Sequence, residues 1–133
     1  MATHPTLKDY IGIAPASGLE LAELIERGLP TKNLDLLKSK GLTFTEMAKT
    51  VISPRTLKHR KARGENLSPE ETERAVRVAS IIRLAESIFG DREKALLWLR
   101  YPNDRLRERT PLSMLQTEPG GRLVESMLWA IGR

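Results

Sequence analysis

The sequence predicts an all-α protein, and three observations lead to this prediction. No segment of the 133 residues alternates β-branched and polar side chains, and no Asn-Gly or Asp-Gly pair marks a hairpin turn. Helix-capping residues recur along the whole chain. Hydrophobic residues make up 40% and charged residues 29% of the chain, which is typical of a globular protein. Because aromatic residues make up only 5%, we expect a core built mainly from aliphatic side chains.

The N-terminal half is expected to hold a loosely ordered start, residues 1–16, followed by capped helices. Ser17 with Glu20, and Thr43 with Glu46, each form the spacing of a capping box, in which side chain and backbone satisfy each other's hydrogen bonds. Glycines and a proline supply further boundaries. The resulting helices are expected over residues 17–28, 30–41 and 43–50.

Further helices are expected over residues 53–62, 68–89, 91–101 and 111–115, with a last one after Pro119-Gly120-Gly121. Ser68-Pro69, with Glu71 three residues after the serine, is the strongest start signal in the chain. The helix that follows carries apolar residues on more than one face, so we expect it to be buried on two sides. The connector before it suggests two helical units, residues 17–66 and 67–133.

The formal net charge of +5 comes from one short stretch. Residues 53–63 contain five basic and no acidic side chains, while the rest of the chain holds seventeen of each. Such a concentrated charge indicates a polyanionic partner. A solvated basic face, or a surface for an acidic protein, is the alternative interpretation.

Two short helices around Val51-Ile52 have the layout of a helix-turn-helix, whose second helix enters the DNA major groove. Arg55, Thr56 and His59 lie where base edges would be read. The side chains expected to hold phosphates are Lys58, Arg60, Lys61 and Arg63. The turn has no glycine to supply a positive φ, so an atypical turn is expected.

Enzymatic function is not expected. The chain has no cysteine and only two histidines, His4 and His59, and it lacks metal-ligand spacing and a phosphate-binding glycine loop. We therefore expect no cofactor and no metal. No apolar run is long enough to span a membrane and the start does not read as a secretory signal, so a cytoplasmic protein is expected.

A second pattern lies in the C-terminal half and resembles the Xre/MbcA/ParS family of antitoxins over roughly residues 17–131. It comprises Phe89-Gly90-Asp91, Trp98-Leu99, Pro102-Asn103 and Thr110-Pro111-Leu112, with Arg55-Thr56-Leu57 and Arg60 upstream. The resemblance implies an Xre-like helix-turn-helix joined to a toxin-binding domain. It also implies a toxin partner, commonly of the NAD-degrading RES class, whose active site the antitoxin covers. Repression of its own operon as a dimer is implied as well.

These implications and the apolar last helix define two further sets of candidate residues. The toxin-binding set is Leu123, Met127, Leu128, Trp129, Gly132 and Arg133. The dimerisation set, on the long two-sided helix, is Val78, Ile81, Ile82 and Ile88. Closure of the chain's own core is the alternative role for most of these side chains. The alternative function is a stand-alone helix-turn-helix transcription regulator whose C-terminal unit only dimerises.

Overall fold

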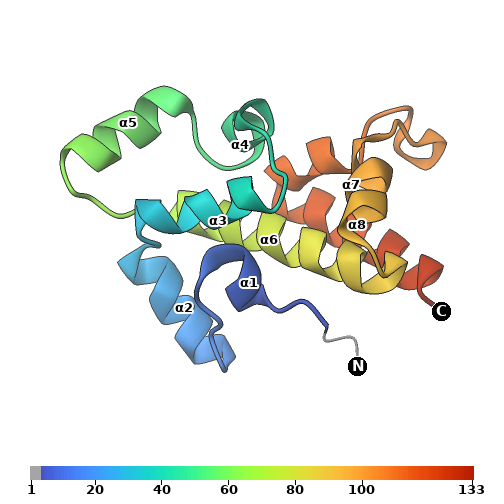
Figure 1. Ribbon diagram of the computed structural model, residues 1–133, viewed down its shortest axis with the longest axis horizontal. Helices are drawn as coiled ribbons and strands as arrows, with labels where there is room; N and C mark the ends of the chain where they lie inside the picture. Colours follow the sequence, from blue (N-terminus) through green and yellow to red (C-terminus); the bar gives the residue numbers. More distant parts are fainter. Residues whose placement is uncertain (1–3) are drawn as a thin grey trace.

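The protein is built from helices around one long central helix, as a computed structural model that describes residues 4–133 shows (Figure 1). Within those residues there is no strand, only an isolated bridge between Asn103 and Arg109. The all-α prediction is therefore confirmed. The α-helices and 3-10 helices (η) are α1 Leu7–Ile11, α2 Gly18–Arg27, η1 Thr31–Asn33, α3 Leu34–Ser39, α4 Phe44–Thr50, α5 Pro54–Ala62, α6 Pro69–Phe89, α7 Arg92–Arg100, η2 Asp104–Leu106, η3 Leu112–Gln116 and α8 Glu118–Ile131.

Helix α6 organises the core because other helices cover it on several sides. Helices α1, α2, α4, α7 and α8 all pack on it, as does η3. The expectation of a helix buried on two sides is confirmed. The residues of α6 with 0% or 1% exposure are Ala75, Val78, Ala79, Ile82 and Ala85. One hydrophobic cluster contains residues from both halves of the chain. The two helical units thus share a core.

Most helix starts lie where capping residues predict them. The hydroxyl oxygens of Thr43 and Ser68 accept the backbone N–H groups of Glu46 and Glu71, and both glutamates return the bond to the cap backbone. Helix α8 begins earlier than expected, at Glu118, because the Thr117 hydroxyl oxygen accepts the Gly120 N–H. The two glycines therefore lie inside the first turn of α8 rather than before it.

The expectation of a loosely ordered start is wrong for α1. Tyr10 and Ile11 in this helix have no exposed surface, and α1 packs against α3 and α6. The Tyr10 hydroxyl donates a hydrogen bond to Glu86 of α6. Burial in the core, the largest cause, and the carboxylate together raise the pKa of Tyr10 well above its usual range. The expectation for residues 1–3 lies outside the described residues.

Among the described residues, no helix has both the length and the apolar composition that crossing a membrane requires.

Candidate functional site

Helices α4 and α5 form the expected helix-turn-helix, and no residue of their turn has a positive φ. Val51 has φ −119° and ψ −64°, and Ser53 has φ −67° and ψ 150°, so neither lies in the left-handed region. The Val51 and Ile52 side chains are 2% and 4% exposed. Both N–H groups donate to the Met47 carbonyl oxygen. These two β-branched residues therefore anchor the turn in the core, and no positive φ is needed.

Helix α5 presents a basic outer surface, as predicted. Leu57 is its only buried residue. Arg55 and His59 are exposed and Thr56 is half-buried. Among the predicted phosphate contacts, the exposed ones are Lys58, Lys61 and Arg63. Within residues 4–133 none of these basic side chains makes an ion pair, so their charges are available to an outside partner.

Arg60 differs from the other basic residues of α5 because it is engaged inside the protein. Its Nε atom donates to Glu71 Oε1 at 2.8 Å and its Nη2 atom to Oε2 at 3.2 Å. Its Nη1 atom lies 3.4 Å from Glu65 Oε1. Burial alone would raise the pKa of Glu71, but the bonds from Arg60 and Ser68 outweigh it and hold this pKa below its usual value. In the structure the Arg60 side chain therefore contacts α6, and its contact with a phosphate stays a prediction.

The predicted toxin-binding residues of α8 fall into two groups. Trp129 is 52% exposed and Leu123 is 45% exposed, and Gly132 and Arg133 are exposed too. Met127 and Leu128 are 7% and 0% exposed. This last pair faces the interior, so it closes the core rather than offering a surface to a partner. Ile131 is also 46% exposed, but it lies about 200° around the helix from Trp129, on the side that carries Val124 and Leu128.

Sequence reasoning missed two exposed apolar side chains, one in α7 and one directly after it. Leu97 and Tyr101 are 72% and 73% exposed. Leu97 lies within α7, whereas Tyr101 follows the last residue of the helix and has an extended backbone, with φ −95° and ψ 135°. Trp98, by contrast, faces inward and its ring centroid lies 6.0 Å from that of Phe89. The sequence offered no signal for this exposure, because the apolar periodicity of a short helix does not show which of its side chains stay uncovered.

The predicted dimerisation residues are mostly covered within one chain. Val78, Ile81 and Ile82 are 0%, 4% and 1% exposed. Only Ile88 is partly accessible. The apolar second side of α6 is therefore filled by the chain's own helices, and the sequence pattern could not tell this from cover by a second copy.

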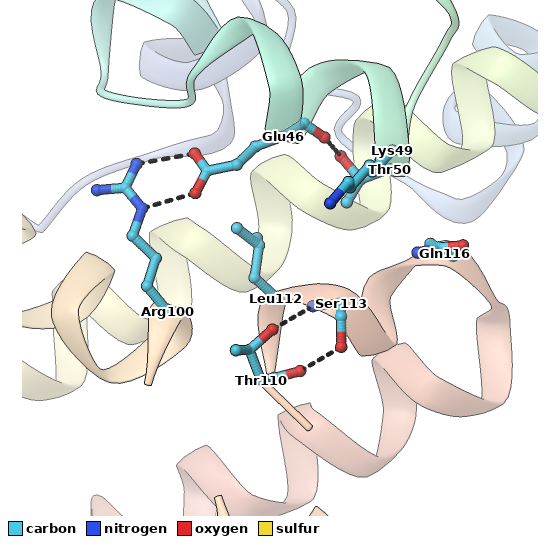
Figure 2. Close-up of a pocket in the computed structure, with 8 residues that line it drawn as sticks. All are labelled: Glu46, Lys49, Thr50, Arg100, Thr110, Leu112, Ser113 and Gln116. Atoms are coloured by element: carbon cyan, nitrogen blue, oxygen red, sulfur yellow. Dashed lines mark hydrogen bonds and ion pairs between the residues drawn. The ribbon is translucent and has the colours of Figure 1, made fainter. Parts of the chain in front are cut away.

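A cavity of about 360 Å³ lies between α4 and the segment around η3 (Figure 2). At its edge Arg100, the last residue of α7, donates to both carboxylate oxygens of Glu46 at 2.7 and 2.8 Å and to the Gly41 carbonyl oxygen. Burial would raise the pKa of Glu46, but the bonds from Arg100 and Thr43 outweigh it and lower this pKa. The pair ties the first helix of the helix-turn-helix to the C-terminal half.

The described residues hold no cluster of three or more histidine, aspartate or glutamate side chains that could bind a metal ion. The two histidines lie apart: the His4 Nδ1 atom is 3.3 Å from the Ser87 hydroxyl oxygen, and His59 is exposed on α5.

Comparison with known proteins decides the family. Residues 20–80 match the antitoxin Xre-like helix-turn-helix domain, and residues 84–132 match the antitoxin Xre/MbcA/ParS C-terminal toxin-binding domain. A protein named antitoxin Xre from Pseudomonas putida is 36% identical over 87% of this chain and 73% of its own length. The chain belongs to the Xre/MbcA/ParS family of antitoxins. Antitoxins Xre of Yersinia enterocolitica (31% identical, over 90% of this chain and 87% of theirs) and Photorhabdus laumondii (28%, over 91% and 84%) are similar too.

The two matched domains contain the helices described above. The first matched range contains α4 and α5, and the second contains α7, η3 and α8. The chain is thus a type II antitoxin with a toxin-binding domain and a helix-turn-helix, and it is not an enzyme. The two ranges meet within α6, whereas the sequence placed the boundary between residues 66 and 67, so that division stays a prediction.

Proposed function

We propose that this cytoplasmic antitoxin neutralises a RES-class, NAD-degrading toxin by covering the active site of the toxin with the outer face of α8. The antitoxin also represses the operon that encodes it, by binding DNA through α5. The observation that carries the toxin part is the exposure of Trp129, Leu123 and Ile131 on a helix of the toxin-binding domain. Large apolar side chains that stay exposed on a toxin-binding domain are available for contact with another protein. Tryptophan is also among the residues that contribute most to binding energy at interfaces.

Point variants test the toxin surface, because deleting α8 would also remove core residues such as Val124 and Leu128. We expect Trp129→Ala to lower neutralisation of the toxin encoded by the neighbouring gene, measured as survival and NAD⁺ content on co-expression. Loss of an interface tryptophan costs about 2 kcal/mol or more, roughly thirtyfold in affinity. Leu19→Ala, at an exposed apolar site on α2 outside the toxin-binding range, is the matched control. Equal neutralisation by both variants would contradict the assignment of α8.

The DNA part of the proposal is supported by the unpaired basic side chains of α5. Each phosphate neutralised by such a side chain releases counterions, so the affinity falls with salt in proportion to the number of contacts. We expect Lys58→Ala to make the slope of log K against log salt shallower by about 0.9. Lys94→Ala, an exposed lysine on α7 with no ion pair in residues 4–133, is the control that should leave the slope unchanged.

Base reading is assigned to Arg55, at the start of α5. Its guanidinium can bind a guanine edge with two hydrogen bonds. Arg55→Ala should therefore reduce binding to the operator more than binding to random DNA. An equal loss on both would count against direct readout by this residue.

A homodimer completes this proposal, since two recognition helices about one turn of DNA apart bind operators with two-fold symmetry. The surface for it is not the buried part of α6. An apolar groove of about 370 Å³ between α2, α6 and α8 includes Leu21, Ile25 and Val76. Sedimentation equilibrium should show a dimer for the native chain and a weaker dimer or a monomer for Ile25→Glu. A native chain that is monomeric at every concentration would contradict the proposal.

A further inference from the structure

Helix α5 has few contacts of its own that could fix its orientation. One side chain, Leu57, is buried, at 7% exposure. The ribbon shows α5 at one end of the molecule, joined to the rest by extended segments on both sides (Figure 1). A helix of nine residues is not stable in isolation in water, so it depends on tertiary contacts. Any contact that fixes α5 therefore bears on whatever α5 recognises.

The strongest polar contact of α5 is the two-bond pair between Arg60 and Glu71. Glu71 is 7% exposed, and its Oε1 atom also accepts the Ser68 N–H at 2.8 Å. One carboxylate thus caps the start of α6 and holds α5 at the same time. The parallel geometry of guanidinium and carboxylate restricts orientation as well as distance. A buried carboxylate that loses its partner is strongly destabilised, so the pair resists opening.

We propose that Arg60 and Glu71 are positioning residues for DNA recognition: their pair fixes the orientation of α5, while the exposed basic residues of α5 make the DNA contacts. This inference rests on the proposed role of α5. When the pair is broken, α5 populates its binding orientation for a fraction of the time, and the apparent affinity for DNA falls by that fraction.

Glu71→Gln separates positioning from charge, because the two explanations predict opposite signs. Removing a negative charge beside a basic helix strengthens binding to a polyanion if charge alone matters. If the pair positions α5, the same substitution weakens binding. We expect a loss of roughly fivefold to tenfold for Glu71→Gln and for Arg60→Ala, about the net effect of one ordinary hydrogen bond. Arg60→Lys should restore only part of it, since lysine cannot form the two-bond fork.

The salt slope gives an independent reading on the same variants. Arg60→Ala removes a positive charge. If Arg60 only positions α5, the substitution removes no contact with a phosphate. Its slope should equal that of the native chain, whereas Lys58→Ala should be shallower by about 0.9. The probes are the DNA upstream of the gene for this chain and a random duplex of the same length.

Amide hydrogen exchange of the free, full-length protein supplies a readout that needs no DNA. Arg60→Ala and Glu71→Gln should raise exchange in α5 and leave α7 unchanged, and Lys58→Ala should leave α5 unchanged. Binding by Glu71→Gln as tight as native, or unchanged exchange in α5, would overturn the inference. If the native chain binds neither DNA, the proposed function of α5 fails and the positioning role fails with it. Faster exchange in α5 would then show that the pair is structural only.

Discussion

At the scale of single residues, two glutamates each connect parts of the chain that are distant in sequence. Glu46 and Glu71 each cap a helix and each accept two bonds from an arginine, Arg100 and Arg60 respectively. The capping role could be predicted, since it depends on a spacing of three residues. The arginine partners could not, because Glu46 and Arg100 are brought together only by the folded chain.

The lowered pKa values of Glu46 and Glu71 predict how stability depends on pH. In the unfolded chain the pKa of a glutamate is about 4.3. The unfolded chain therefore protonates Glu46 and Glu71 at a higher pH than the folded chain does. The contribution of both pairs is therefore fully present above about pH 5 and is lost as pH falls through the folded-state pKa values.

We expect the melting temperature to fall less between pH 6 and pH 3 in Glu46→Gln than in the native chain, because the amide does not titrate. The native chain loses the contribution of both pairs over this range, whereas Glu46→Gln can lose only that of the Arg60–Glu71 pair. Thermal unfolding followed by circular dichroism measures this. Glu125→Gln, an exposed acid without an ion pair in the described residues, should keep the native dependence. Parallel curves for Glu46→Gln and native chain would show that the pair does not contribute.

At the scale of helices, local sequence signals predicted where helices begin but did not predict which residues are buried. Ser68, with Pro69 and Glu71, predicted the start of α6 because capping is a local interaction. Helix α1 was missed because its five residues are ordered by burial of Tyr10 and Ile11, which sequence periodicity over so short a segment cannot show. The same limit applies to α8, where Leu128 and Trp129 are neighbours in sequence and face opposite environments.

The start of α8 depends on one glycine and not on its neighbour. A Cβ atom at Gly120 would overlap the backbone carbonyl oxygen of Met114, whereas at Gly121 it would meet the Cδ atom of the Arg77 side chain at 2.8 Å. We expect Gly120→Ala to lower the free energy of unfolding by about 2 kcal/mol or more. Gly121→Ala should lower it by less than Gly120→Ala does, because a side chain can give way more readily than the backbone. Urea unfolding measures both, and equal effects would contradict the close approach of η3 to α8.

At the scale of the whole molecule, the two surfaces lie at opposite ends. The ribbon places α5 at one end of the long axis and the C-terminal end of α8 at the other (Figure 1). The all-α class and the two functional halves could be predicted from capping, charge and family motifs. The location of the surfaces could not, because it depends on how α6 is wrapped by the other helices.

This separation predicts that toxin and DNA bind at the same time. Toxin on the outer face of α8 should leave α5 accessible, so the DNA affinity of the toxin–antitoxin complex should be no weaker than that of the antitoxin. Fluorescence anisotropy with labelled upstream DNA, titrated with antitoxin or with the purified complex, compares the two. Release of DNA on addition of toxin would show that the surfaces interfere.

The central claim is tested most directly by NAD⁺ consumption with purified proteins. The product of the neighbouring gene is assayed alone and with increasing amounts of this chain, and complex formation is followed by co-purification. The account predicts a stable complex in which NAD⁺ consumption stops as the toxin becomes saturated, and a weaker effect of Trp129→Ala. No complex, or a complex that consumes NAD⁺ at the rate of the toxin alone, would contradict it and leave a stand-alone DNA-binding regulator as the better account.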